Sequence, residues 1–129
     1  MLIPIVIMNC LKNKTFDCTD GKQFRDFIYV EDVINAVVAC FENKLSIGEI
    51  FNIGTNKPIK IKKLIIYINR LIKKGKPLFG KISLRKDEQL RFYPSIFKIS
   101  KILNWKPKIL LNKGINRTIK FYKSHEQNN

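Results

Sequence analysis

The chain has 129 residues, of which 45% are hydrophobic and 27% are charged, so it can form one domain with a single core and does not resemble a disordered protein in composition. Its 25 basic and 10 acidic side chains give a formal net charge of +15, which favours nucleic acid, anionic membranes or phosphorylated ligands as partners. Only five of the basic residues are arginine, the side chain that makes bidentate phosphate contacts, so we interpret most lysines as solvated surface and do not favour nucleic-acid binding.

The cysteines and the apolar runs indicate the cellular compartment in which the protein is expected to act. Cys10, Cys18 and Cys40 form neither a C-x-x-C pair nor an even disulfide set, which predicts reduced thiols in a cytoplasmic protein. The opening apolar run, residues 1–11, is too short to span a bilayer and has no basic leader, so we expect no membrane association. The single histidine, His125, has no cysteine or second histidine nearby, and the sequence predicts no metal site.

Apolar periodicity predicts mainly helices in the first half of the chain. A helix over residues 4–12 is apolar on nearly all sides, so it should be buried or contact protein that this chain does not contain. There follow a strand over 15–18, a turn over 19–22, an extended segment over 26–30, an amphipathic helix over 31–43, a strand over 49–53, a turn over 54–58 and a helix over 62–74. Glu31 and Asp32 lie in the first turn of the 31–43 helix, where acidic side chains complement the helix dipole.

The second half is predicted to contain two further helices separated by irregular chain. Its elements are a loop over 77–80, a short strand over 82–84, a polar connection over 85–94, a helix that Ser95 caps and Asn104 ends, and a last helix over 112–123. Trp105 follows the first of these helices, and we expect it to anchor the core between the two. The domain is expected to span residues 1–123, with a disordered tail over 124–129.

Four motifs then follow one another in a fixed order. They are R-D-F-I-Y-V-E-D at 25–32, F-N-I-G at 51–54, L-N-W-K-P at 103–107, and G-I at 114–115 opening a helix that ends K-F-Y at 120–122. Together they resemble the NAD-dependent epimerase/dehydratase family, the extended short-chain dehydrogenases/reductases. The resemblance implies an α/β fold: a small carboxy-terminal, substrate-binding lobe of short strands and about five helices, without the Rossmann half that binds NAD.

The family binds a nucleoside diphosphate sugar between its two lobes, and the resemblance assigns roles to individual residues. Arg25 and Arg85 would grip the diphosphate, because a pyrophosphate is held well by planar, permanently charged guanidinium groups. Glu88 would accept hydrogen bonds from ribose hydroxyls. Phe16 and Cys18 match positions that line the nucleobase pocket, although Cys18 stands where many members have an aromatic residue.

Each of these residues also has a simpler interpretation. Arg25 could pair with Asp26 at the surface, and Arg85 could pair with Glu88 on a helix. Phe16 and Cys18 could equally be core residues, since aromatic side chains and small thiols are commonly buried.

The sequence lacks the groups that would perform the family's chemistry. It contains neither a G-x-x-G-x-x-G loop nor a Tyr-x-x-x-Lys pair, so we expect no catalytic residue here and no NAD or NADP bound by this chain alone. We therefore predict a substrate-binding fragment of an NAD(P)-dependent nucleotide-sugar epimerase, dehydratase or reductase, in the synthesis of sugars for bacterial surface polysaccharide such as O-antigen or capsule. Its protein partner would be the missing Rossmann lobe or a second copy. The alternatives are a non-catalytic nucleotide-sugar-binding module and a basic nucleic-acid-binding domain.

Overall fold

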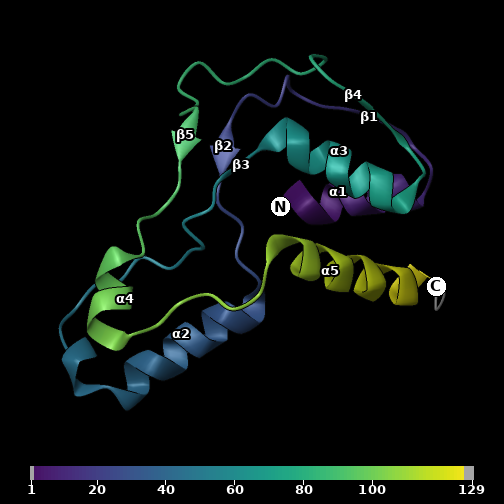
Figure 1. Ribbon diagram of the computed structural model, residues 1–129. Helices are drawn as coiled ribbons and strands as arrows, with labels where there is room; N and C mark the ends of the chain where they lie inside the picture. Colours follow the sequence, from purple (N-terminus) through teal and green to yellow (C-terminus); the bar gives the residue numbers. More distant parts are fainter. Residues whose placement is uncertain (1, 127–129) are drawn as a thin grey trace.

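A computed structural model describes residues 2–126, which form two groups of helices joined by short strands and long connections (Figure 1). The first group contains α1 (Leu2–Leu11), α3 (Ile61–Ile72) and α5 (Leu111–Glu126), with α1 packed against both of the others. The second contains α2 (Val30–Glu42), the single turn η1 (Lys44–Ser46) and α4 (Phe97–Leu103). The five helices and few short strands confirm the expected α/β fold.

The strands are two or three residues long and join segments that lie far apart in the sequence. In one pair, β1 (Thr15–Asp17) runs parallel to β4 (Lys76–Leu78). In the other sheet, β2 (Phe24–Arg25) lies between β3 (Ile59–Lys60), which is antiparallel to it, and β5 (Arg91–Phe92), which is parallel. Arg25 therefore stands on the middle strand, opposite Ile59 on one side and Phe92 on the other.

The main core lies between α1, α3 and α5. The α1 side chains of Val6, Ile7 and Cys10 are buried in it, next to the α3 side chains of Leu64 and Ile68. Each fully buried aliphatic side chain contributes roughly 1.5–3 kcal/mol through removal of its surface from water. Of the two expectations for the apolar first helix, burial is the one observed: α3 and α5 of this chain cover it, and Ile5 is 56% exposed.

A smaller second core lies between α2 and α4. Ala36, Ile99 and Trp105 are buried in it, and Phe51 and Ile53 pack against them. Trp105 is held at the end of α4, where Asn104 takes the left-handed conformation with φ of 50° and the Ser100 hydroxyl donates to the Trp105 carbonyl at 2.9 Å. The expected roles of Trp105 as a core anchor and of Asn104 as a helix stop are both confirmed.

The strand predictions were less successful than the helix predictions. Residues 49–53 and 82–84 are not strands, whereas β4 overlaps the start of the predicted 77–80 loop and β5 lies in the predicted 85–94 connection. The segment predicted to be extended, residues 26–30, is not a strand. The nearest strand is β2, which ends just before it at Arg25. A strand exists only where a second segment supplies hydrogen bonds, and these pairings join residues distant in sequence. Alternation of apolar residues alone cannot show whether such a partner exists.

The last helix is longer than its sequence pattern indicated. Helix α5 runs to Glu126, three residues beyond the predicted end at Lys123, so residues 124–126 of the expected tail are helical. The remaining tail residues, 127–129, lie outside the described part of the chain. His125 is exposed, as expected for a residue without a site. Between residues 2 and 126, no helix is both long and apolar enough to cross a membrane.

Asp32 fastens the chain after α4 to the start of α2. Its side chain is only 1% exposed, and its carboxylate accepts hydrogen bonds from the backbone N–H groups of Lys108 at 3.0 Å and Ile109 at 2.8 Å. A carboxylate that accepts backbone N–H bonds in a buried place is a strong, charge-assisted contact. The sequence interpretation of Asp32 as a helix-dipole partner missed this role.

Asp26 fixes the turn that follows residue 53 through hydrogen bonds of the same kind. Its carboxylate accepts hydrogen bonds from the N–H groups of Thr55 at 2.6 Å and Asn56 at 2.9 Å, and from the Thr55 hydroxyl. Gly54 is required beside it, because a Cβ atom there would lie 2.7 Å from an Asp26 oxygen and 2.5 Å from a Pro94 carbon. The F-N-I-G motif thus ends in glycine for lack of space.

Replacing Asp32 with alanine tests this fastening. Asp32→Ala leaves two backbone donors without their acceptor, so we expect the free energy of unfolding in urea to fall by about 2–4 kcal/mol. The matched control is Glu31→Ala in the same helical turn, where the exposed carboxylate pairs with Arg117 at 2.8 Å. Glu31→Ala should cause a much smaller loss. Equal losses would mean that both residues act only through the helix dipole.

Candidate functional site

Arg25 is fixed by the sheet that carries it. It lies on the middle strand β2, with its side chain 25% exposed, and its Nη1 donates to the carbonyl of Phe24 at 2.8 Å. The guanidinium is therefore tied to its own strand and partly shielded from water. A guanidinium positioned in this way still has N–H groups in one plane with which to bind an anion.

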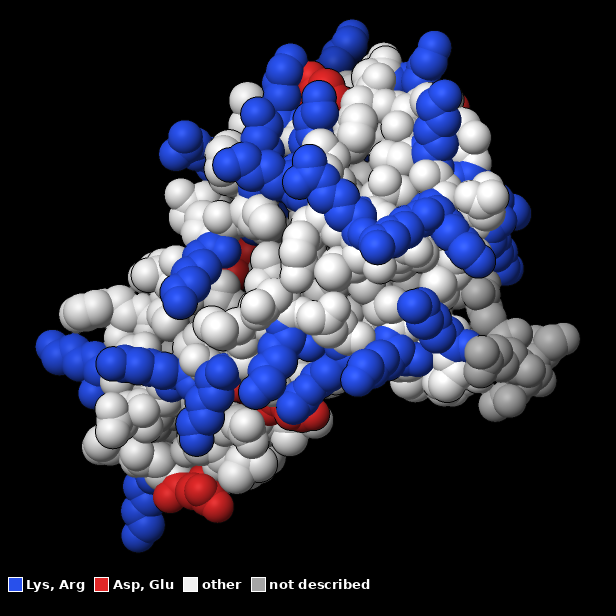
Figure 2. Space-filling model, turned by 45° about the vertical axis from the view of Figure 1, so that its right-hand side comes forward, with Lys and Arg blue, Asp and Glu red and all other residues white. Residues whose placement is uncertain are grey.

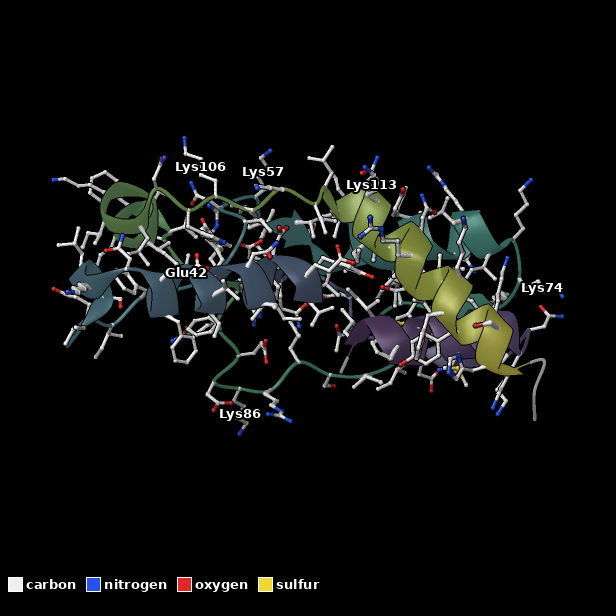
Figure 3. The ribbon with its side chains drawn as sticks, turned by 90° about the horizontal axis from the view of Figure 1, so that it is seen from below. Glu42, Lys57, Lys74, Lys86, Lys106 and Lys113 are labelled. Carbon is white, nitrogen blue, oxygen red and sulfur yellow. The ribbon has the colours of Figure 1, made fainter. Side chains whose placement is uncertain are left out.

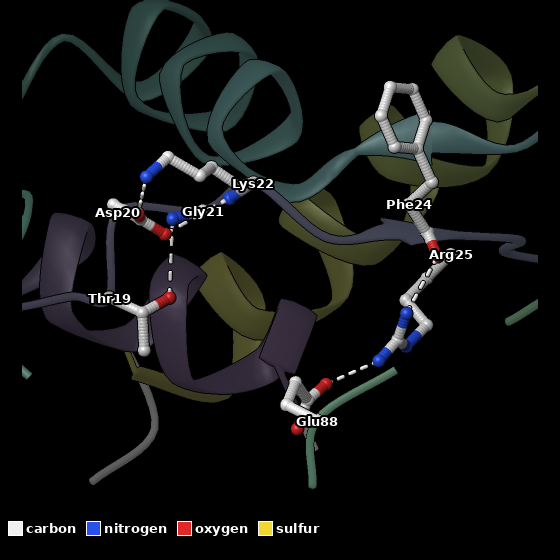
Figure 4. Close-up of polar contacts among 7 residues, drawn as sticks. All are labelled: Thr19, Asp20, Gly21, Lys22, Phe24, Arg25 and Glu88. Carbon is white, nitrogen blue, oxygen red and sulfur yellow. Dashed lines mark hydrogen bonds and ion pairs between the residues drawn. The ribbon is translucent and has the colours of Figure 1, made fainter. Parts of the chain in front are cut away.

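Glu88 pairs with Arg25 across 63 residues of sequence. A Glu88 oxygen, Oε1, accepts a hydrogen bond from Nη2 of Arg25, and the Glu88 side chain is 26% exposed (Figure 4). The pair is less solvated than an ordinary surface ion pair, so water weakens it less. Neither simple pairing considered from the sequence, Arg25 with Asp26 or Arg85 with Glu88, corresponds to this contact.

Arg85 lies one turn away from Glu88. The Glu88 N–H donates to the Arg85 carbonyl at 3.2 Å, which closes a turn over residues 85–88. The Arg85 side chain is exposed, and it takes part in none of the ion pairs found within residues 2–126. The structure thus brings together three of the five predicted site residues, two by direct contact and the third through a shared turn.

The loop that carries Arg85 and Glu88 is held at both ends. At its start, the Cys18 carbonyl accepts hydrogen bonds from the N–H groups of Lys81 at 3.1 Å and Ile82 at 3.2 Å. At its end, the Leu90 carbonyl accepts from the Phe24 N–H at 2.7 Å, next to the β2–β5 pairing. The loop is therefore anchored beside β1 and beside Arg25, which limits where residues 85–88 can move.

The turn before β2 has the form that its sequence predicted. Thr19 Oγ1 accepts from the Gly21 N–H and Asp20 Oδ1 from the Lys22 N–H, each at 3.3 Å (Figure 4). Gly21 has a φ of +65°, and its carbonyl accepts from the Lys62 N–H at 3.0 Å. A hydrogen bond from the Lys22 ammonium lowers the pKa of Asp20. This turn fixes the direction in which the chain enters β2.

Phe16 and Cys18 are placed in the main core. Cys18 is 8% exposed and belongs to the buried cluster, and Phe16 is half-buried against the same cluster. Burial raises the pKa of the Cys18 thiol, and nearby Asp17 and Cys10 raise it further. Both positions agree with the core role that the sequence left open, and their contact with a nucleobase stays a prediction.

The charged surface is spread out. Figure 2 shows Lys and Arg side chains along the whole of one face, with a few Asp and Glu among them. Lys57, Lys106 and Lys113 project from one side of the molecule (Figure 3), and the first two line an open groove of about 420 Å³ with Thr55 and Phe97. These lysines are exposed, as expected for solvated surface.

Comparison with known proteins places these features in a family. Residues 1–54 match the NAD dependent epimerase/dehydratase family. The CDP-abequose synthase of Salmonella typhimurium is 33% identical over 125 residues, which are 92% of this chain and 41% of that protein. The dTDP-glucose 4,6-dehydratase 1 of Escherichia coli is 30% identical over 132 residues, 96% of this chain and 36% of that protein. The chain belongs to the NAD-dependent epimerase/dehydratase family.

A solved member of the epimerase/dehydratase family supports the same placement. The UDP-glucuronic acid 4-epimerase of Bacillus cereus, in complex with UDP-glucuronic acid and NAD, superposes on 96% of this chain with a TM-score of 0.85 and 28% identity. The superposition covers 40% of that protein, and the chain spans about two fifths of the length of its curated relatives. The fold is thus consistent with the carboxy-terminal part of the family's proteins.

The residues of this chain do not fit the NAD that the family name implies. The six glycines include no two at the spacing of a dinucleotide-binding loop, since none lies within four positions of another. No Tyr-x-x-x-Lys pair is present to act as general acid and base. Within residues 2–126 no three His, Cys, Asp or Glu side chains are grouped to hold a metal.

The positions that sequence reasoning missed are the acidic residues of the R-D-F-I-Y-V-E-D motif. Asp26 and Asp32 position the chain around Arg25, but their partners are backbone N–H groups 29 and 76 residues away. The signal in the sequence is that both aspartates belong to the same motif as Arg25.

The reactivity of the cysteines tests where Cys18 lies. Because burial raises the pKa of the Cys10 and Cys18 thiols, both should react more slowly with iodoacetamide at pH 7.5 than the less buried Cys40. Peptide mass spectrometry over a time course measures the three rates in one sample. Labelling of Cys18 as fast as Cys40 would place its sulfur in an accessible pocket and favour the nucleobase role.

Proposed function

We propose that the chain binds the diphosphate of a nucleotide sugar, as the substrate-binding part of an NAD(P)-dependent epimerase, dehydratase or reductase. The observation that carries the proposal is the placement of Arg25 on a central strand, in contact with Glu88 and beside the turn that holds Arg85. On this proposal residues 1–123 are the nucleotide-sugar-binding lobe.

The chemistry of the three residues suits a nucleoside diphosphate. The two guanidinium groups supply permanent positive charge and planar donors for the phosphate oxygens. Glu88 orients Arg25 through Oε1, and its Oε2 is the oxygen that would accept a hydrogen bond from a ribose hydroxyl. The three residues would thus supply partners for both the diphosphate and the ribose of the nucleotide.

The reaction itself would take place on groups outside this chain. The relatives named above include a synthase, a dehydratase and an epimerase, so the choice among these reactions depends on the part that carries the cofactor and the acid/base pair. In that part, NAD or NADP would supply hydride chemistry. We further propose that the sugar belongs to bacterial surface polysaccharide, because the segment L-R-K-D-E at 84–88 resembles that of family members that make or modify such sugars.

Calorimetric titration tests the binding proposal. UDP-, CDP-, GDP- and dTDP-sugars are titrated into the chain one at a time, with NAD as a separate ligand, at low and high salt. We expect one class of nucleotide sugar to bind and NAD not to bind. Arg25→Ala and Arg85→Ala should each weaken the affinity roughly 10- to 100-fold, because each removes charge-assisted hydrogen bonds.

Arg70→Ala on α3 is the matched control, since Arg70 is an exposed arginine like Arg85 but lies outside the site. Its affinity should equal that of the unaltered chain. Unchanged affinity in both Arg25→Ala and Arg85→Ala would contradict the proposed site. Binding of DNA or RNA that falls steeply with salt and survives the Arg25 change would instead favour a nucleic-acid-binding domain.

A further inference from the structure

The open groove of about 420 Å³ beside Lys57 and Lys106 lies between three segments that are distant in sequence. Its walls are the turn at 55–57, the start of α4 with the residues before it at 95–100, and the chain after α4 at 106–107. Small-molecule sites in proteins usually enclose roughly 300–1,000 Å³, so the groove is large enough to hold a small organic ligand. The side chains along it define the chemistry of that ligand.

The groove lies on the opposite side of the molecule from the loop that carries Arg85 and Glu88. Figure 3 shows Lys57 and Lys106 projecting from one side, whereas Lys86, which follows Arg85, projects from the other. None of the candidate site residues lines the groove. The groove is therefore separate from the candidate diphosphate site.

The charge of the groove is positive. Lys57 and Lys106 are both exposed and take part in none of the ion pairs found within residues 2–126. No aspartate or glutamate is among the described residues that line the groove. Asp26, the carboxylate that binds the turn at 55–57, is already bonded to two N–H groups and the Thr55 hydroxyl. The two free ammonium groups favour an anion.

A phosphate monoester matches this pair of lysines in charge. At pH 7 such a group carries a charge of about −1.5 to −2, whereas a carboxylate carries only one negative charge. Two ammonium groups at the mouth of one groove therefore neutralise one phosphate monoester.

Phe97 gives the groove an exposed aromatic ring. It is the first residue of α4 and is 71% exposed, although the same short helix buries Ile99 in the second core. Ile96 and Pro107 add further apolar surface to the lining. An aromatic ring that faces water offers a flat surface on which a second ring, such as a nucleobase, can stack. A phosphorylated ligand without a ring would leave this surface unused.

The walls of the groove are held by hydrogen bonds within the chain. The turn at 55–57 is bonded to Asp26, as described above. On the other wall, the Ser100 hydroxyl donates to the Trp105 carbonyl at 2.9 Å, which fixes the chain directly before Lys106. Because both walls are fixed without a ligand, binding does not have to order them.

We propose that this groove is a second ligand site, which binds a phosphate monoester joined to a flat ring, as in a nucleoside monophosphate. The phosphate lies between the ammonium groups of Lys57 and Lys106, and the ring stacks on Phe97. This inference goes beyond the proposed function and does not depend on it, because the two sites share no residue.

Nuclear magnetic resonance of the isotope-labelled chain tests the proposal. The probe is adenosine monophosphate, and the matched control ligand is ribose 5-phosphate, which has the same phosphate and sugar but no base. Adenosine monophosphate should shift the amide signals of 55–57, 97–100 and 106 saturably. Ribose 5-phosphate should need an at least roughly tenfold higher concentration, because it cannot stack. Equal affinity for the two compounds, or no shift of these amides, would overturn the proposal.

Substitution of Phe97 tests the role of the ring. Phe97→Ala and Phe97→Leu should each weaken the binding of adenosine monophosphate about tenfold, since both remove the ring while the leucine variant keeps apolar bulk. The matched control is Phe121→Ala on α5, where the phenylalanine is 56% exposed and outside the groove. It should leave the affinity unchanged. Affinity equal to that of the unaltered chain in Phe97→Leu would contradict stacking and overturn the proposal.

Substitution of the lysines tests the role of charge. Lys57→Ala and Lys106→Ala should each weaken the binding of adenosine monophosphate roughly threefold to tenfold at low salt and less at high salt, because exposed charges are screened. The matched control is Lys120→Ala on α5, an exposed lysine outside the groove. A loss in Lys120→Ala as large as in the two groove variants would mean that net charge alone attracts the phosphate, and the proposal would be wrong.

The positions of the shifted amides separate this outcome from that of the proposed function. Shifts confined to Arg25 and residues 85–88 would overturn the groove and leave the proposed diphosphate site intact. Saturable shifts in the groove, with no response of Arg25 and residues 85–88 to any nucleotide sugar, would support the groove and count against the proposed function.

Discussion

Two carboxylates that bind backbone N–H groups hold the middle of this molecule together. Asp26 and Asp32, six residues apart, fasten the chain at 55–56 and at 108–109. Arg25 directly precedes Asp26, so the contact that fixes the carboxylate also fixes the strand that carries the guanidinium. The position of the candidate anion site is thus a consequence of the same hydrogen bonds that join the two groups of helices.

What the sequence could reveal depended on how local each feature was. The periodicity of α1, α2, α3 and α5 reflects neighbours three and four residues apart, and all four helices were predicted. Strands β4 and β5 depend on partners about 60 residues away, which no local pattern contains. The family resemblance pointed to Arg25, Arg85 and Glu88 as site residues, but not to the Arg25–Glu88 contact, which depends on how the long loop returns to β2.

Composition alone does not distinguish a general attraction for anions from the specific binding of one anion. The positions of the charged side chains in the structure do distinguish them. Lys and Arg side chains lie along the face seen in Figure 2 and provide a general attraction for anions. Arg25 is different, since it is partly buried, hydrogen-bonded to its own strand and paired with Glu88. Meanwhile α2 carries no basic residue and keeps an apolar side toward solvent. On the proposed function, general attraction for anions and specific binding of a diphosphate belong to different parts of one small fold.

The apolar side of α2 that faces solvent, with Ile34, Val38 and Phe41, has a consequence for the order in which such an enzyme is synthesised. In a relative whose amino-terminal part precedes this region, that part is synthesised first, so any surface of it that packs on α2 is already folded when α2 emerges. The helix then never has to remain uncovered during translation. A chain translated separately meets its partner only by diffusion, and until that encounter its apolar helix is available to chaperones and to aggregation.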